Sequence, residues 1–188
     1  TGQSQEIQNG AKSALVDEYS LASRLSYFLW STMPDQELVD LAAKGELRAN
    51  LAAQVRRMLE SRRSDAMARN FAGQWLQARD VEGISINARA VMRREGQRVD
   101  FDFEGELRNA MRRETEMYFG HVMRENRPLA EFIDSDYTFL NAKLATHYGI
   151  PGVEGRDFRK VTLPADSPRG GLITQGTVLV VTSNPTRT

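Results

Sequence analysis

Apolar residues recur every three or four positions between residues 20 and 78, and this spacing is typical of amphipathic helices. Four separate stripes predict four consecutive helices with short joints, the first over about 18–31 and the fourth over about 63–78. A stripe of this kind faces a core, so the pattern predicts that its larger side chains are buried. These are Leu25, Phe28, Leu41, Val55, Phe71 and Trp75.

Capping residues separate the stripes. Thr32-Met33-Pro34-Asp35 is a helix-start sequence, because Thr32 can cap the helix, Asp35 lies three residues further on, and Pro34 is tolerated in the first turn. Lys44-Gly45 is typical of a helix end, and Asn50 is placed to cap a third helix. Start and stop signals therefore agree with the helices that the stripes predict.

The pattern changes after residue 78. Residues 79–100 combine glycines with scattered charge, and we interpret them as a long connection. A helix over about 102–126 follows, and it has the clearest apolar stripe in the chain. Another helix is predicted to begin at Asp136 or Thr138, to carry Leu140 and Tyr148, and to end at Gly149.

The last forty residues are rich in proline and glycine, which predicts loops. Phe158–Leu163 alternates well enough for a short strand. Leu172–Thr182 is ambiguous, because its β-branched residues favour a strand while its apolar positions also share one helix face, and we prefer the helix. The sequence therefore predicts an all-α fold, an irregular helical bundle with a long loop near 79–100 and a loop-rich C-terminal segment.

Composition excludes several classes of function. The 188 residues are 40% hydrophobic and 27% charged, which is typical of a globular domain, and their formal net charge is zero. No overall field therefore attracts nucleic acid or an anionic membrane. The absence of cysteine excludes disulfides, thiolate metal sites and covalent haem attachment within this chain. No apolar run is long enough to span a membrane, and the polar first ten residues are not a signal peptide. The sequence also contains neither a phosphate-binding loop motif nor a serine-hydrolase motif.

Glu114 is the first candidate for chemistry, because it falls in the centre of the apolar stripe of the predicted 102–126 helix. A buried carboxylate is costly unless it is paired, neutral or solvated. Arg24 flanks the apolar face of the first helix, so we expect a buried ion pair that orients the two helices. The alternatives are a general base or metal ligand with a shifted pKa, or simple exposure to solvent.

Two histidines complete the candidates. His121 and Glu125 share a side of the helix with Glu114, which invites a metal site. Ferritin-like di-iron sites need Glu-x-x-His on each of two helices, and the residue three before His121 is Tyr118, so we expect no metal. His147 lies at a predicted helix end, where the helix dipole favours its charged form, and we interpret it as a packed or capping residue.

Several longer motifs resemble two families of unknown function. Over about residues 19–188 the chain is similar to the domain-of-unknown-function family numbered 1592, running from Arg169 into the start of the companion family numbered 1588. The resemblance divides the chain into a lead-in (1–16), a helical domain (17–165) and a truncated companion domain (166–188). The motifs are Leu21–Trp30 with Met33-Pro34-Asp35, Asn70–Leu76, Arg113-Glu114-Thr115, Asp136–Asn141, His147–Ile150 and Arg169–Thr188.

The resemblance indicates in which kind of protein such a domain occurs, but it assigns the domain no activity. Such domains belong to large exported proteins of planctomycetes and related bacteria, commonly beside c-type cytochrome domains and sometimes beside carbohydrate-binding modules. We therefore expect a binding or scaffolding module, at the periplasm or cell surface, whose partners are other domains or chains of the same protein. Any haem would lie in an associated domain, where His147 could contact it. The alternative is part of an enzyme that acts on a polysaccharide or other extracellular polymer, possibly by redox chemistry.

Overall fold

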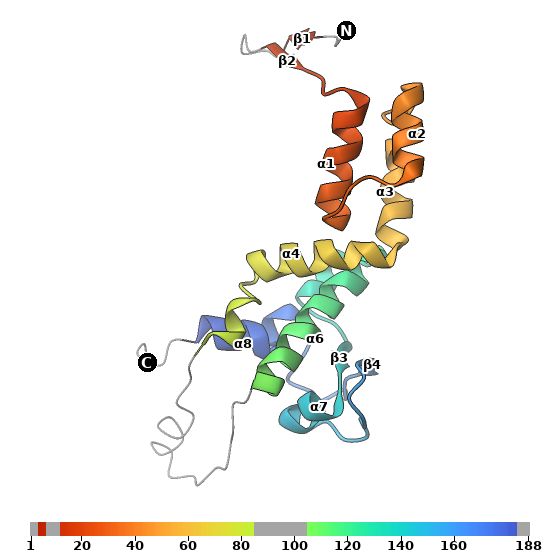
Figure 1. Cartoon of the computed structure of the whole chain (residues 1–188). Helices are drawn as coiled ribbons and strands as arrows, with labels where there is room; N and C mark the ends of the chain where they lie inside the picture. The colour runs from red at the N-terminus through yellow and green to blue at the C-terminus, as the bar shows by residue number, and fades with distance from the viewer. Residues whose placement is uncertain (1–3, 7–11, 85–104, 184–188) are drawn as a thin grey trace. The chain divides into compact units, whose positions relative to one another are not determined.

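The computed structural model describes residues 4–6, 12–84 and 105–183 (Figure 1). Residue contacts divide the chain into two compact units, residues 1–67 and 68–188, with the boundary inside helix α4 (Asp65–Trp75). The fold is mostly helical, as predicted, but it also contains two short antiparallel strand pairs, so the all-α prediction is only partly confirmed. Within the described ranges, no helix is long and apolar enough to cross a membrane.

The first unit is built from short helices that begin and end at local signals. After a strand pair in the lead-in, β1 (Ser4–Glu6) with β2 (Lys12–Ala14), come α1 (Glu18–Trp30), α2 (Gln36–Lys44) and α3 (Leu51–Glu60). Asp35, and not Thr32 as predicted, caps α2 by accepting a hydrogen bond from the Leu38 amide at 3.2 Å, and Gly45 ends the helix in the left-handed conformation. The four helices predicted between residues 20 and 78 are confirmed, and no strand interrupts them.

The core of the first unit forms around Trp30. Its indole Nε1 donates to the Met58 carbonyl at 2.9 Å, so the ring is buried without leaving its donor unpaired. The guanidinium groups of Arg57 and Arg63 lie 5.5 and 5.0 Å from the ring centre. The buried apolar residues around it are Ala22, Leu29, Leu38, Ala42, Leu47 and Met58.

The predicted burial of the large side chains is wrong for three of the six. Leu25, Leu41 and Val55 are half-buried, but Phe28 is 64%, Phe71 45% and Trp75 54% exposed. In α4 the buried positions are all small residues, Ala66, Ala68, Ala72 and Gly73. Small residues allow a neighbouring helix to approach closely, and the aromatic rings of the stripe then lie at the edge of that contact.

The second unit is arranged around α6 (Gly105–Arg124), which contacts α7 (Ala142–Tyr148), α8 (Gly176–Thr182) and β3 (Tyr137–Leu140) (Figure 1). Strand β3 pairs in antiparallel fashion with β4 (Arg159–Thr162). The predicted strand near 158–163 and the preferred helix within 172–182 are confirmed. Single 3-10 turns link these elements at Asp80–Glu82, Leu129–Phe132 and Leu172–Thr174.

The helix predicted from Asp136 or Thr138 is wrong in its first part. Residues 137–140 form β3, whose four side chains are all buried, and the helix begins only after Asn141. Asn141 caps it by accepting a hydrogen bond from the Leu144 amide at 3.0 Å. Pairing with β4 satisfies the backbone of residues 137–140, which a pattern read along the chain does not reveal.

Two other predictions concern segment boundaries. Most of the connection predicted at 79–100 lies outside the described residues. The segment after residue 165 packs inside the second unit, where Leu172 lies in one core with Tyr118, Val122 and Tyr137. This segment therefore supplies part of the surroundings of α6.

Candidate functional site

Glu114 occupies the centre of the second unit, as its place in the apolar stripe predicts. The side chain is 1% exposed, and each carboxylate oxygen accepts one hydrogen bond from a hydroxyl group. Thr138 Oγ1 of β3 donates to Oε1 at 2.5 Å, and Tyr148 Oη at the end of α7 donates to Oε2 at 2.6 Å. The carboxylate therefore joins α6 to two elements that follow it in the chain.

A second layer of contacts surrounds Tyr148. Its hydroxyl oxygen accepts a hydrogen bond from the Gly176 amide at 2.8 Å. The Arg169 guanidinium lies 3.6 Å from the ring centre and donates to the Thr174 carbonyl at 2.8 Å. Tyr148 therefore links Glu114 to the segment that leads into α8.

The electrostatics of the site set the protonation of both groups. Burial raises the pKa of Glu114 to about 7, against the hydrogen bonds from Thr138 and Tyr148 and the attraction of Arg169, which favour the charged form. Burial, together with the neighbouring Glu114, raises the pKa of Tyr148 well above its ordinary value. Glu114 therefore gains and loses a proton near neutral pH, while Tyr148 stays protonated.

The predicted ion pair between Arg24 and Glu114 is wrong. Arg24 is exposed on α1, and the Glu114 oxygens accept hydrogen bonds from hydroxyl groups of the second unit. The positive charge that acts on Glu114 is that of Arg169. Arg169 lies beyond the helices whose apolar stripes the sequence shows, so nothing in the stripe pattern pointed to it.

A small cavity lies beside Glu114. Its volume is about 10 Å³, and Thr138, Arg169, Thr174 and Gln175 contribute to its lining. That volume accommodates about one water molecule. A sugar ring or another substrate of that size does not fit, so a catalytic role for Glu114 on a polymer gains no support from the geometry.

His121 lies apart from Glu114, against other groups. Its Nε2 is 3.2 Å from the Lys160 ammonium nitrogen, and its ring packs edge-on against Tyr137 and Phe139. Burial, and then the charge of Lys160, lowers the pKa of His121, so the neutral ring accepts a hydrogen bond from Lys160. Glu125 is exposed, and no group of three metal-ligating side chains occurs in the part of the chain that the structure describes.

His147 is half-buried on α7, with its ring 5.6 Å from that of Tyr148. The expectation that the helix end favours its charged form is wrong, because burial, followed by the charge of Arg169, lowers its pKa. Burial at this position outweighs the partial charge of a helix end. His147 is therefore a neutral packing residue at neutral pH.

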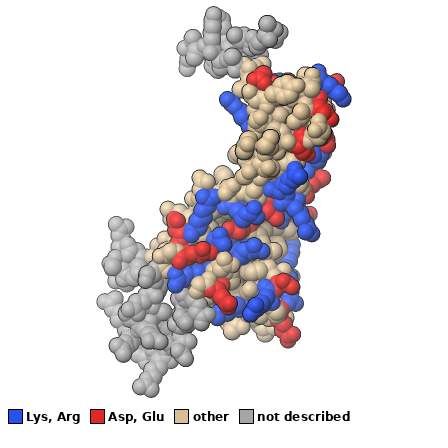
Figure 2. Space-filling model, in the orientation of Figure 1, with Lys and Arg blue, Asp and Glu red and all other residues tan. Residues whose placement is uncertain are grey.

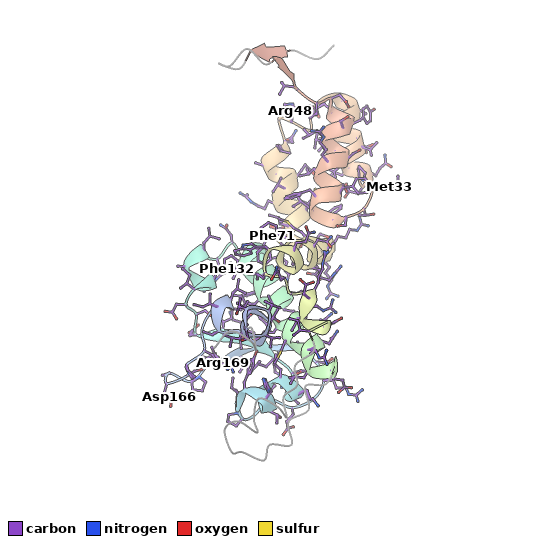
Figure 3. The ribbon with its side chains drawn as sticks, turned by 90° about the vertical axis from the view of Figure 1, so that its left-hand side faces the viewer. Met33, Arg48, Phe71, Phe132, Asp166 and Arg169 are labelled. Carbon is purple, nitrogen blue, oxygen red and sulfur yellow. The ribbon has the colours of Figure 1, made fainter. Side chains whose placement is uncertain are left out.

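Sequence reasoning missed an aromatic surface of the second unit, because it placed two of the rings in the core. This aromatic surface consists of the exposed Phe71 and Trp75 of α4 and the half-buried Phe132 of the turn at 129–132, and these rings pack on the buried ring of Phe119 of α6. Figure 3 labels Phe71 and Phe132. Neighbouring ring centres are 5.7 Å apart for Phe71 and Trp75, 6.2 Å for Trp75 and Phe132, and 5.5 Å for Phe119 and Phe132. Two exposed aliphatic side chains, Leu129 and Ile133, lie in or beside the same turn as Phe132.

Charged side chains of both signs are interleaved over the face of the second unit that Figure 2 shows. The second unit also contains ion pairs: Arg112 Nε lies 3.0 Å from Glu82 Oε1, and Arg127 Nη2 lies 2.7 Å from Glu131 Oε1. The mixture of positive and negative side chains agrees with the zero net charge of the sequence, and that face carries no large basic patch. The apolar aromatic surface is thus the more distinctive surface feature.

Comparison with known proteins identifies one relationship. Residues 16–150 match the model of the family described as PSD4: Protein of unknown function (DUF1592). No curated protein and no solved structure matches the chain. The match ends before Arg169, where the resemblance to the companion family was expected to begin.

Proposed function

This chain belongs to the PSD4 family of proteins of unknown function (DUF1592), and from that premise we propose that it is a helical binding module. Its partner is a folded domain of the same larger protein, which packs an apolar face on the aromatic surface. We propose that this larger protein is one of the exported, cytochrome-associated proteins of bacteria, and that any haem lies in another of its domains. We also propose that the companion domain begins at Arg169. The resemblance of the sequence motifs is the support for this context.

The observation that carries the proposal is the exposure of Phe71 and Trp75. Phe71 is 45% and Trp75 54% exposed although both are large apolar side chains. Burying the exposed half of such a ring contributes about 2.5 kcal/mol, from roughly 100 Å² at 25 cal/mol per Å². Large aromatic side chains are enriched at the centres of protein interfaces, where a partner removes their exposed area from water.

The shape of the aromatic surface favours a protein partner over a polysaccharide. The Phe71 and Trp75 rings are inclined by 44°, and those of Trp75 and Phe132 by 69°, so they do not form one flat platform for a sugar ring. The exposed aliphatic side chains Leu129 and Ile133 extend the apolar character. Uneven apolar surfaces of this kind fit a partner that brings interdigitating side chains.

Tryptophan fluorescence tests the proposal directly, because the chain has only two tryptophans, Trp30 and Trp75. A Trp30→Phe variant leaves Trp75 as the reporter in the aromatic surface. Acrylamide quenching of Trp75, measured in each protein as the difference between the Trp30→Phe variant and the Trp30→Phe/Trp75→Phe variant, should be strong in the 188-residue chain and several-fold weaker in the complete gene product. Equal quenching in the two proteins would refute the proposal.

Matched substitutions locate the contact. Phe71→Ser in the complete gene product should restore quenching of Trp75 and increase proteolytic cleavage between domains. Phe28→Ser is the control, because Phe28 is also an exposed phenylalanine, 64% exposed, but belongs to the first unit. If both substitutions have the same effect, the aromatic surface is not the binding site. An absorption spectrum of the same preparation tests the cytochrome association.

A further inference from the structure

Gln175, immediately before α8, is a buried polar residue with one unpartnered end. The side chain is 3% exposed, and its Oε1 accepts a hydrogen bond from Thr115 Oγ1 at 2.7 Å. Its Nε2 has no hydrogen-bond partner among the residues that the structure describes. A buried donor without a partner costs roughly 1–3 kcal/mol, so such a group points to a ligand.

Gln175 and Glu114 line the same cavity, which supplies complementary chemistry. The amide nitrogen of Gln175 donates hydrogen bonds. The Glu114 carboxylate can accept about four hydrogen bonds, and the two hydroxyl groups that donate to it leave about two of these sites free. Arg169 and Thr174 also line the cavity. A ligand between these groups must accept a hydrogen bond from Gln175 and donate one to Glu114.

Size and charge restrict the ligand to one kind. The cavity has a volume of about 10 Å³, which is about one water molecule. The Arg169 guanidinium disfavours a cation in the cavity, and the Glu114 carboxylate disfavours an anion. The remaining ligand is neutral, is both donor and acceptor, and has the size of water.

We infer that this cavity is a binding site for a single water molecule, held by Gln175 Nε2 and the Glu114 carboxylate. The water joins α6 to the segment before α8 through two hydrogen bonds, beside the direct bond between Thr115 and Gln175. It also places an exchangeable proton next to Glu114.

Water contacts measured by NMR on the 15N-labelled 188-residue chain test the site. The side-chain amide protons of Gln175 should show cross-peaks to water, with nuclear and rotating-frame Overhauser effects of opposite sign, as a long-lived bound water gives. The Thr115 hydroxyl proton is a confounding source, because it exchanges with water and lies beside the amide. In Thr115→Val, which removes this hydroxyl, the cross-peaks should persist, and their loss would overturn the inference.

A high-resolution crystal structure gives the second measurement. We expect one isolated oxygen density between Gln175 and Glu114 in the wild type and its loss in Gln175→Met, a variant of similar length without the donor. A wild-type cavity without density, or density that remains unchanged in Gln175→Met, would overturn the assignment. If Gln175→Met does not fold, the wild-type density and the NMR cross-peaks still decide the question.

Discussion

Replacing Glu114 by Gln should make the second unit less sensitive to pH, and the sign follows from the direction of the pKa shift. Burial raises the pKa of Glu114 from 4.5 to about 7 in the folded chain. A carboxyl group with a raised pKa contributes stability that is fully present below about pH 4.5. This contribution is lost as the pH rises through about 7, because folding then keeps a charge in a buried site. Gln carries no charge at any pH, so the variant does not lose this contribution.

The structure sets the size of the effect. The difference between the two pKa values corresponds to roughly 3 kcal/mol, at about 1.4 kcal/mol per pKa unit. At pH 5 Glu114 is protonated in the folded chain, so the variant should be as stable as the wild type or less stable by about 1 kcal/mol. The loss arises because the amide nitrogen of Gln cannot accept the hydrogen bond that Thr138 or Tyr148 donates to Glu114. At pH 9 the variant should be more stable than the wild type by about 2 kcal/mol. The order of stability should therefore reverse between about pH 5 and 6, because the carboxyl group of the unfolded chain is already ionised above pH 4.5.

Urea unfolding at several pH values between 5 and 9, followed by circular dichroism, measures this difference. Subtracting the two free energies of unfolding removes the titration of groups that both proteins share, such as His121 and His147. Arg169→Met should raise the pKa of Glu114 further and destabilise the wild type more at pH 9 than at pH 5, whereas Arg24→Met serves as the control without that pH dependence. A difference between wild type and Glu114→Gln that stays constant over this range would refute the reasoning.

Two other substitutions test the packing of each unit. Gly176→Ala should lower the stability of the second unit by about 1–3 kcal/mol in urea unfolding, because its Cβ would lie 2.8 Å from the Tyr148 hydroxyl. A Cβ at Gly105 meets no atom of the described residues within 4 Å, so Gly105→Ala is the control. Similar losses for both glycines would contradict this. Arg57→Met should destabilise the first unit by about 1 kcal/mol at pH 7 and by less at pH 3, because the hydrogen bond from Arg57 lowers the pKa of Asp35. The stability that the Arg57–Asp35 pair contributes is present above pH 3.8 and is lost as the pH falls and Asp35 is protonated. If thermal unfolding shows that Arg57→Met destabilises the protein more at pH 3 than at pH 7, the pair does not contribute in this way.

Local signals made much of the helical structure predictable. Gly45 and Gly149 act within a few residues of themselves, and α2 and α7 end where these glycines predict. The stripe that carries Glu114 also predicted its burial correctly. These features depend on spacing along the chain, which a single sequence contains in full.

Features that depend on distant partners were not predictable. Tyr137–Leu140 fits a helical pattern as well as a strand, and its pairing with β4 decides between them. Likewise, burial of Glu114 required compensation, but spacing along α6 does not distinguish Arg24 from Arg169 as the charge that supplies it. The apolar stripe of α4 contains alanines as well as rings, and contact with α6 through Ala68 and Ala72 leaves Phe71 and Trp75 at the edge.

The late position of Leu172 and Gly176 in the chain has a consequence for synthesis on the ribosome. The contacts that hold the first unit together, such as Trp30 with Met58 and Arg48 with Glu18, are complete once its own residues have emerged. The second unit stays open until the residues that cover Tyr118 and Tyr148 have been made, long after α6 itself. During that interval the nascent chain carries the uncovered apolar stripe of α6, and aggregation competes with folding most strongly at this stage. A chaperone that acts on this protein should therefore bind while translation proceeds from α6 to α8.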